Sequence, residues 1–179
     1  MSPFPALPGF YQTLFLHLEP VSTFIPVLMT HIYPGAAWFH YQLIPSDAPV
    51  PTFLDPRSTM AIWQLGNCYM LLSMLSSFVF RAVRDALPNN PVAQERILGA
   101  SLFAMAVADV HEPLNSIVAT FVGLPEDLRY SPHLWNSMTH GNITTVIVLL
   151  AGRIAWFMGI GRKRYYFGQP KDSTATKSK

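Results

Sequence analysis

The stretch ILGASLFAMAVADVHEPLNSIVATFV, residues 97–122, decides the class of fold. It is almost wholly apolar, and it is longer than the ~20 residues that a helix needs to cross the ~30 Å hydrocarbon core of a bilayer. Three ionisable side chains nevertheless stand near its centre: Asp109, His111 and Glu112. Whether these groups belong to a soluble core or to a membrane depends on the rest of the chain.

Three other apolar stretches approach the same length, about residues 10–33, 59–80 and 141–160. The second contains no charged residue, and the last contains only Arg153. Charged residues make up 12% of the chain, against about 25% in typical soluble proteins. A soluble bundle with buried core helices is the alternative, but soluble helices of this length need a polar face. The pattern therefore predicts an all-α fold, a bundle of four transmembrane helices within residues 1–162.

Lysine and arginine are divided unevenly between the two sides that four spans would define. The side shared by both termini and the loop 81–96 carries nine: Arg81, Arg84, Arg96, Arg162, Lys163, Arg164, Lys171, Lys177 and Lys179. The other two loops carry Arg57 and Arg129. Because positive charge stays on the cytosolic side, we expect cytosolic N- and C-termini and an integral protein of the endoplasmic reticulum membrane. The polar, basic tail 163–179 is predicted to be disordered.

Helical periodicity gathers the polar residues of 97–122 on one arc. With Asp109 at zero and 100° per residue, Glu112 falls at about 300°, Asn115 at about 240° and His111 at about 200°. Small residues lie within or beside this arc, at positions Ala100, Ala104 and Ala108. Polar and small residues are therefore expected to face partner helices, with bulky apolar residues toward lipid. Pro113 predicts a kink, because its ring clashes with the carbonyl group four residues back, that of Asp109.

Matching the depth of residues across the four spans predicts two polar contacts. At ~1.5 Å per residue, Asn67 and Asp109 fall at similar depth. A polar cavity is expected in the non-cytosolic half, lined by Gln64, Asn67, Asp109, Glu112, Asn115, His140 and Asn142. The same calculation puts Glu19 and Arg153 each about 10–12 Å from the cytosolic side. We interpret them as a structural ion pair. In the alternative, the Arg153 side chain extends to the interface.

The carboxyl groups of the third stretch carry the predicted chemistry. A carboxyl group in an apolar cavity is pushed toward its neutral form and becomes a proton donor. Asp109 is the expected acid, with Glu112 or His111 as its partner, and the other polar residues of the cavity would orient the substrate. Such a site could protonate an epoxide or an alkene, and capture by water or by an internal group would give hydrolysis or cyclisation. The pattern HEPLN has Asn115 where zinc-protease helices have a second histidine. The sequence also has no glycine-rich phosphate loop and no dinucleotide-binding pattern, and we expect no metal and no cofactor.

Four motifs carry a resemblance to a known family. They are LPGFYQTLFLHLEP (residues 7–20), QLGNCYMLL (64–72), ADVHE (108–112) and LWNSMTHGN (134–142). Together they resemble a family of small four-helix fungal membrane proteins whose members often accompany secondary-metabolite genes. In its expected chemistry, the protonation of an epoxide or alkene within a membrane, the chain is also similar to membrane-bound fungal meroterpenoid cyclases and to small hydrolases of polyene-polyketide pathways.

The resemblance implies a membrane enzyme of fungal secondary metabolism with a lipophilic polyketide or meroterpenoid substrate. Its partners would be that substrate, the lipid bilayer and other enzymes of the pathway. A net charge of +2 gives no reason to expect nucleic acid. The alternative is a non-catalytic membrane scaffold or carrier, in which the polar arc only holds the helices together. Interhelical hydrogen bonds in membranes average only ~0.6 kcal/mol, which is too little to offset the burial of three ionisable groups. This comparison favours the enzyme over the scaffold or carrier.

Overall fold

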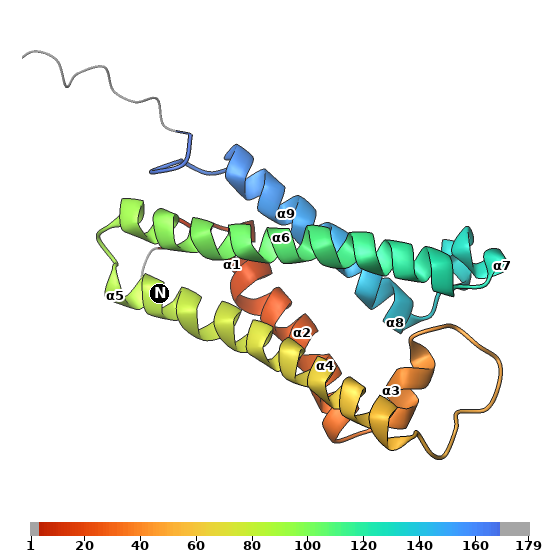
Figure 1. The fold of residues 1–179 in the computed structure, drawn as a ribbon. Coiled ribbons are helices and arrows are strands. Elements are labelled where there is room, and N and C mark those ends of the chain that lie inside the picture. The colour runs from red at the N-terminus through yellow and green to blue at the C-terminus, as the bar shows by residue number, and fades with distance from the viewer. Residues whose placement is uncertain (1–3, 169–179) are drawn as a thin grey trace, which may run out of the picture.

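The computed structural model describes residues 4–168, apart from the side chains of residues 108–123. The described residues form helices and connecting loops, without β-strands. Four long helical segments follow one another up and down (Figure 1). The first long segment comprises α1 (Phe10–Thr13), the π-helix η1 (Leu14–Leu18) and α2 (Glu19–His31). The second comprises α4 (Pro56–Met74), the π-helix η2 (Leu75–Val79) and α5 (Phe80–Ala86), and the third is the single helix α6 (Pro91–Gly123). The fourth comprises α8 (Ser137–His140), the π-helix η4 (Gly141–Thr145) and α9 (Val146–Met158). Short helices occupy the loops: α3 (Ala36–Gln42), α7 (Glu126–Arg129) and the 3-10 helix η3 (Pro132–Leu134).

Polar caps set the starts of α4 and α6, which begin before the predicted spans at 59 and 97. The Asp55 carboxylate accepts backbone N–H bonds from Arg57 at 3.0 Å and Ser58 at 3.1 Å, so α4 begins at Pro56. Asn90 caps α6 in the same way by accepting from the Ala93 N–H at 3.0 Å. Side-chain oxygens of this kind satisfy the N–H groups that the first turn of a helix leaves free.

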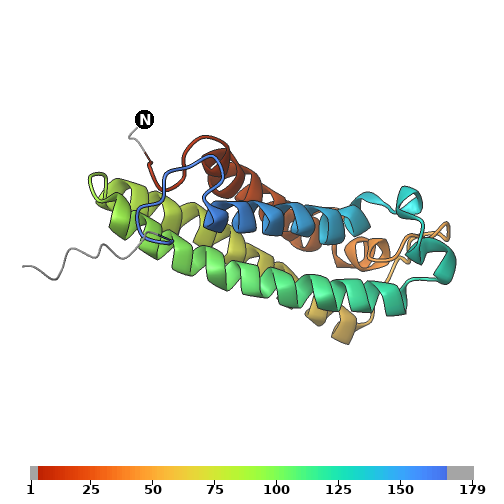
Figure 2. The same ribbon diagram turned by 90° about the horizontal axis from the view of Figure 1, so that it is seen from above.

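The four long helices pack in two pairs. Helix α2 lies along α4, and α6 lies along α9 and η4, with the turn after α5 joining the two pairs. The N-terminal segment, the turn 87–90 and the segment after α9 gather at one end of the bundle (Figures 1 and 2). Helices α3, α7 and α8 lie at the opposite end (Figure 1). Both ends of the described chain are therefore on the same side of the bundle.

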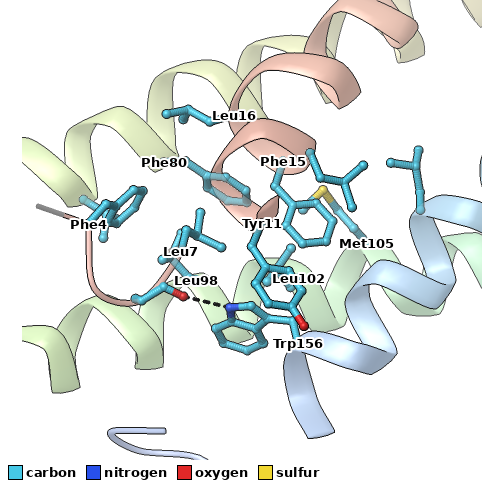
Figure 3. Close-up of a cluster of buried hydrophobic side chains, with 14 residues drawn as sticks. Phe4, Leu7, Tyr11, Phe15, Leu16, Phe80, Leu98, Leu102, Met105 and Trp156 are labelled. Atoms are coloured by element: carbon cyan, nitrogen blue, oxygen red, sulfur yellow. Dashed lines mark hydrogen bonds between the residues drawn. The ribbon is translucent and has the colours of Figure 1, made fainter. Parts of the chain in front are cut away.

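The main hydrophobic core lies near the end that holds both chain termini (Figure 3). Phe4, Ala6 and Leu7 contribute to it, and the last two are fully buried. The Trp156 indole Nε1 donates to the Ala6 carbonyl oxygen at 2.8 Å, and the Tyr11 hydroxyl donates to the Ile160 carbonyl oxygen at 2.6 Å. The segment before the first long helix is thus a structural part of the bundle, which the sequence pattern did not predict.

The predicted small-residue stripe on α6 is wrong for its described members. Ala100 and Ala104 are exposed, and the large buried apolar side chains of α6 form a stripe of Leu98, Leu102 and Met105, with Gly99 buried under Phe167. Close approach occurs instead at Gly152 of α9, where a Cβ atom would lie 2.5 Å from Leu14 Cδ2. Bulky side chains therefore fill the α6 interface, and one glycine admits the first long helix against the fourth.

The outer surface of the bundle is rich in large apolar side chains. Exposed residues of this kind occur on each of the four long helices, among them Phe24, Ile25, Leu71, Met74, Phe103, Val107, Ile147 and Ile154. Within the described residues, two helices are long and apolar enough to cross a membrane: Phe10–His31 and Ser137–Met158.

Candidate functional site

A buried polar centre joins all four long helices. Arg153 of α9 donates through Nη2 to Glu19 Oε1 of α2 at 2.7 Å. Ser76 of η2 donates to the same carboxylate oxygen at 3.3 Å, and Met105 Sδ of α6 lies 3.8 Å from both the Ser76 hydroxyl and Arg153 Nη2. Glu19 and Arg153 are only 3% and 2% exposed. The ion pair predicted from residue depth is therefore confirmed, and its alternative, an Arg153 side chain extended to the interface, is wrong.

Two π-helical segments flank this polar centre. Glu19 directly follows η1, and Ser76 lies within η2. Pro20 has no N–H, so the regular bond from residue 20 to the Leu16 carbonyl oxygen cannot form. The Pro20 carbonyl oxygen in turn accepts a hydrogen bond from the Ser73 hydroxyl at 2.9 Å. Short π-helical insertions occur frequently at functional sites, and here they shift the register of two facing helices beside a buried ion pair.

Four residues predicted to line a polar cavity have described side chains, two on α4 and two on the fourth long helix. Gln64 and Asn67 are exposed on α4. Asn142 of η4 is half-buried and accepts a hydrogen bond from the Tyr69 hydroxyl at 3.4 Å. His140 shares a hydrogen bond with Thr144 Oγ1 at 3.0 Å, and its ring lies 5.4 Å from that of Trp135. Among the described hydrogen bonds, none joins Gln64 or Asn67 to His140 or Asn142.

The predicted catalytic residues Asp109, His111 and Glu112, and the orienting residue Asn115, belong to α6. Their side chains lie outside the described residues, as does the kink expected at Pro113. Elsewhere in the described chain, no three His, Cys, Asp or Glu side chains lie close enough together to hold a metal ion.

A second buried carboxylate, missed by the sequence analysis, fastens the C-terminal segment to α6. Glu95 is 0% exposed and accepts a hydrogen bond from Arg162 Nη2 at 3.0 Å. It also accepts backbone N–H bonds from Tyr165, from Tyr166 at 3.2 Å and from Phe167 at 3.2 Å. Burial alone would raise the pKa of Glu95, but Arg162 and the backbone donors together hold it below the usual value. We call these contacts the C-terminal clasp.

The clasp corrects the prediction of a disordered tail from residue 163. Residues 165–167 donate to Glu95, and the Arg162 guanidinium carbon lies 3.9 Å from the centre of the buried Trp156 ring. The run RKRYYF places three aromatic residues directly after three cations, and this pairing is the signal in the sequence that the segment packs. Residues 169–179 lie outside the described part of the chain.

The fold and its polar centre define a helical-bundle protein with two helices of membrane-spanning length. A family model for a domain of unknown function, DUF7704, matches residues 4–163. The chain belongs to this family. Neither a curated protein nor a solved structure matches the chain significantly.

Proposed function

We propose that the chain is an integral protein of the endoplasmic reticulum membrane with four spans and cytosolic termini. Large apolar side chains are exposed on all four long helices, which is rare over so much of a soluble monomer. The uneven division of lysine and arginine supports the orientation.

Glycosylation mapping in microsomes tests this topology. An Asn-X-Ser acceptor inserted in the loop 43–55 is expected to be glycosylated, because that loop would face the lumen. The same acceptor placed in the turn 87–90 serves as the matched control and is expected to stay unmodified. Glycosylation of the second site alone would reverse the orientation, and release of the protein by alkaline carbonate would contradict membrane insertion.

We further infer an enzyme that acts on a lipophilic polyketide or meroterpenoid of fungal secondary metabolism by acid–base chemistry. The observation that carries this proposal is the register of α6. Its buried stripe, Leu98, Leu102 and Met105, repeats with heptad spacing, and the next positions in that register are 109 and 112. At 100° per residue, Asp109 falls within about 40° of the stripe and Glu112 within about 80°.

The register also revises the choice of catalytic partner. His111 falls about 160° from Asp109 around the helix, away from the stripe that packs against the other helices. Met105 touches the polar centre, and position 109 is one turn further along the same side of α6. Asp109 and Glu112 are therefore the proposed pair, and His111 is the weaker candidate.

Two carboxyl groups at this spacing can share the work of opening an epoxide. The neutral one donates its proton to the epoxide oxygen as the C–O bond breaks, and the ionised one takes a proton from the water whose oxygen bonds to carbon. One water is consumed, and the two carboxyl groups exchange protonation states. With an alkene substrate, the neutral carboxyl protonates the double bond, and an internal hydroxyl or second alkene captures the cation. The ionised carboxylate then takes the proton that the oxonium ion, or the carbon next to the final cation, gives up.

The test compares Asp109→Asn with the wild-type protein in microsomes supplied with a lipophilic trisubstituted epoxide in ¹⁸O-labelled water. Asn keeps the shape of the side chain but has no proton to transfer. Turnover is expected to fall about 10²–10⁴-fold, the usual contribution of a general acid. Incorporation of one ¹⁸O atom identifies hydrolysis, and a product without the label identifies cyclisation.

Asp127→Asn is the matched control, because it makes the same chemical change at an exposed position of α7. It is expected to leave turnover unchanged. Unimpaired turnover by Asp109→Asn in membranes that contain as much protein as the wild type would refute the acid assignment.

A non-catalytic scaffold or carrier is the second candidate, and one observation favours it. Three buried polar side chains serve contacts between long helices: Ser73 bonds to the Pro20 carbonyl, and Ser76 and Arg153 bond to Glu19. If deleting the protein from a producing cell changes only the amount or export of the product and leaves its structure intact, this alternative replaces the enzyme.

A further inference from the structure

A groove on the outside of the first helix pair combines apolar walls with a cationic end. It has a volume of about 290 Å³ and runs between α2 and the helix formed by α4, η2 and α5. The apolar wall comes from Val21, Phe24 and Ile25, whose side chains are exposed. His17 and Arg81 line the groove in η1 and α5, the elements nearer the end of the bundle that holds the chain termini, with Ser77 one turn from Arg81. We call this the α2–α4 groove.

The Arg81 guanidinium is held in the groove by neutral acceptors. Its Nη1 donates to the Ser77 carbonyl oxygen at 3.0 Å, and its Nη2 lies 3.5 Å from the Leu16 carbonyl oxygen. The Leu16 carbonyl is the one that Pro20 leaves without its regular helical donor. The nearby Asp85 carboxylate forms its ion pair with Arg84 at 2.7 Å, and Arg81 acts on it only through longer-range attraction. Arg81 therefore keeps donors and positive charge for an anion that enters the groove.

The position of Arg81 along its helix matches the level of lipid head groups. Residues 56–86 form a helix of about 46 Å at 1.5 Å per residue, close to the ~40–45 Å of a bilayer with its polar regions. Arg81 lies five residues, or about 7 Å, from the end of that helix. From His17 to Phe24 the apolar wall runs about 10 Å toward the bilayer centre.

We propose that the α2–α4 groove binds an anionic phospholipid of the leaflet that faces the chain termini, with the head-group phosphate on Arg81 and an acyl chain along Val21, Phe24 and Ile25. Arginine matches phosphate oxygens with paired donors, and the cytosolic leaflet is the one enriched in anionic lipid. The volume is at the lower limit of small-molecule sites, roughly 300–1,000 Å³, which suits one chain better than a polycyclic substrate. The proposal rests on membrane insertion and is independent of the proposed acid–base chemistry.

The groove also involves both of the π-helical segments that face each other across the first helix pair. His17 belongs to η1, and Ser77 belongs to η2. A π-helical turn widens the helix locally and reorients the side chains that follow. The same insertions that bring Glu19 and Ser76 together on the inner side therefore also contribute lining residues to the groove on the outer side.

The test is a lipid titration of the purified full chain in detergent, followed by native mass spectrometry. Phosphatidylserine is expected to be retained about fivefold more tightly than phosphatidylcholine, the effect of one arginine near anionic lipid. Arg81→Gln, which keeps a donor for the Ser77 carbonyl oxygen but removes the charge, is expected to abolish this preference. Arg84→Gln is the matched control, since Arg84 lies outside the groove lining, and it is expected to keep the preference.

A second variant keeps the proposal testable if Arg81→Gln does not fold. Ser77→Leu fills the groove from the η2 side and is expected to weaken retention of both lipids. Equal retention of the two lipids by the wild-type chain, or an unchanged preference in Arg81→Gln, would overturn the proposal. Binding of soluble glycerol phosphate as tightly as phosphatidylserine would also overturn it, because the groove would then bind a free phosphate and not a lipid.

Discussion

Replacing Glu19 by glutamine should be among the most destabilising single substitutions in the bundle. The amide would keep the size of the side chain and one acceptor oxygen, but it would leave the Arg153 guanidinium without the counter-charge that lies 2.7 Å away. Both side chains are less than 5% exposed, so water cannot replace that charge. Removing one partner of a buried ion pair typically costs about 3–5 kcal/mol. Since a typical domain is stable by about 5–15 kcal/mol, the loss is a large share of the total.

The double substitution Glu19→Leu with Arg153→Met separates the two possible reasons for such a loss. It removes both charges and fills the space with apolar side chains of similar volume. Replacements of this kind are often neutral or even stabilising by about 1–4 kcal/mol. The double variant is therefore expected to be much more stable than Glu19→Gln, because no buried charge is left without its partner.

The assay is unfolding of the purified protein in mixed micelles with increasing dodecyl sulfate, followed by tryptophan fluorescence. Asp85→Asn is the matched control, because it breaks an ion pair of the same 2.7 Å length whose carboxylate is 59% exposed. Exposed ion pairs contribute little to stability, so Asp85→Asn should leave the unfolding midpoint unchanged. If Glu19→Gln unfolds at the same dodecyl sulfate fraction as Asp85→Asn, the reasoning about burial is wrong.

Three further predictions concern the C-terminal clasp and the close packing at Gly152. Glu95→Gln should release the C-terminal segment, detected as faster trypsin cleavage within residues 162–164, because Arg162 loses its buried partner; unchanged cleavage would show that backbone contacts alone hold the segment. The pKa of Glu95 in the folded protein lies below its unfolded value of about 4.3. The C-terminal clasp should therefore be at full strength above about pH 4.3 and should weaken as the pH falls through the folded pKa. Pepsin cleavage of the C-terminal segment can follow this loss. Gly152→Leu should lower the free energy of unfolding by about 1–3 kcal/mol, because the new side chain would overpack against Leu14. Ala151→Leu, at an exposed position, is the control and should leave the unfolding midpoint unchanged.

Much of the helical architecture could be predicted from sequence, because length and apolar content determine where long helices form. The depth calculation also paired Glu19 with Arg153 across 134 positions. That calculation succeeded because both side chains are charged within otherwise apolar helices, where each needs a partner. The helix boundaries were less accurate, because caps such as Asp55 and Asn90 extend helices beyond their apolar stretches.

The faces of the helices were harder to predict, for a physical reason. Small residues permit close packing but do not require it, so Ala100 and Ala104 are exposed while leucine and methionine fill the interface. Depth alone also grouped Gln64 and Asn67 with Asn142, although residues at one depth can point in different directions around their helices. The π-helical turns in η1 and η2 add a further rotation that a uniform 100° per residue does not contain.

The C-terminal clasp and the contact between Trp156 and Ala6 have a consequence for the order in which the protein folds as it is translated. The Trp156 indole binds the Ala6 carbonyl across 150 positions, and residues 165–167 bind Glu95. Residues 4–9 therefore leave the ribosome long before their partners have been translated. Until then the inner faces of the first three long helices lack their partners on the fourth helix and the C-terminal segment. A nonsense mutation before residue 165 would thus remove a contact of α6, whereas one before residue 156 would also leave the start of the chain without its place in the core.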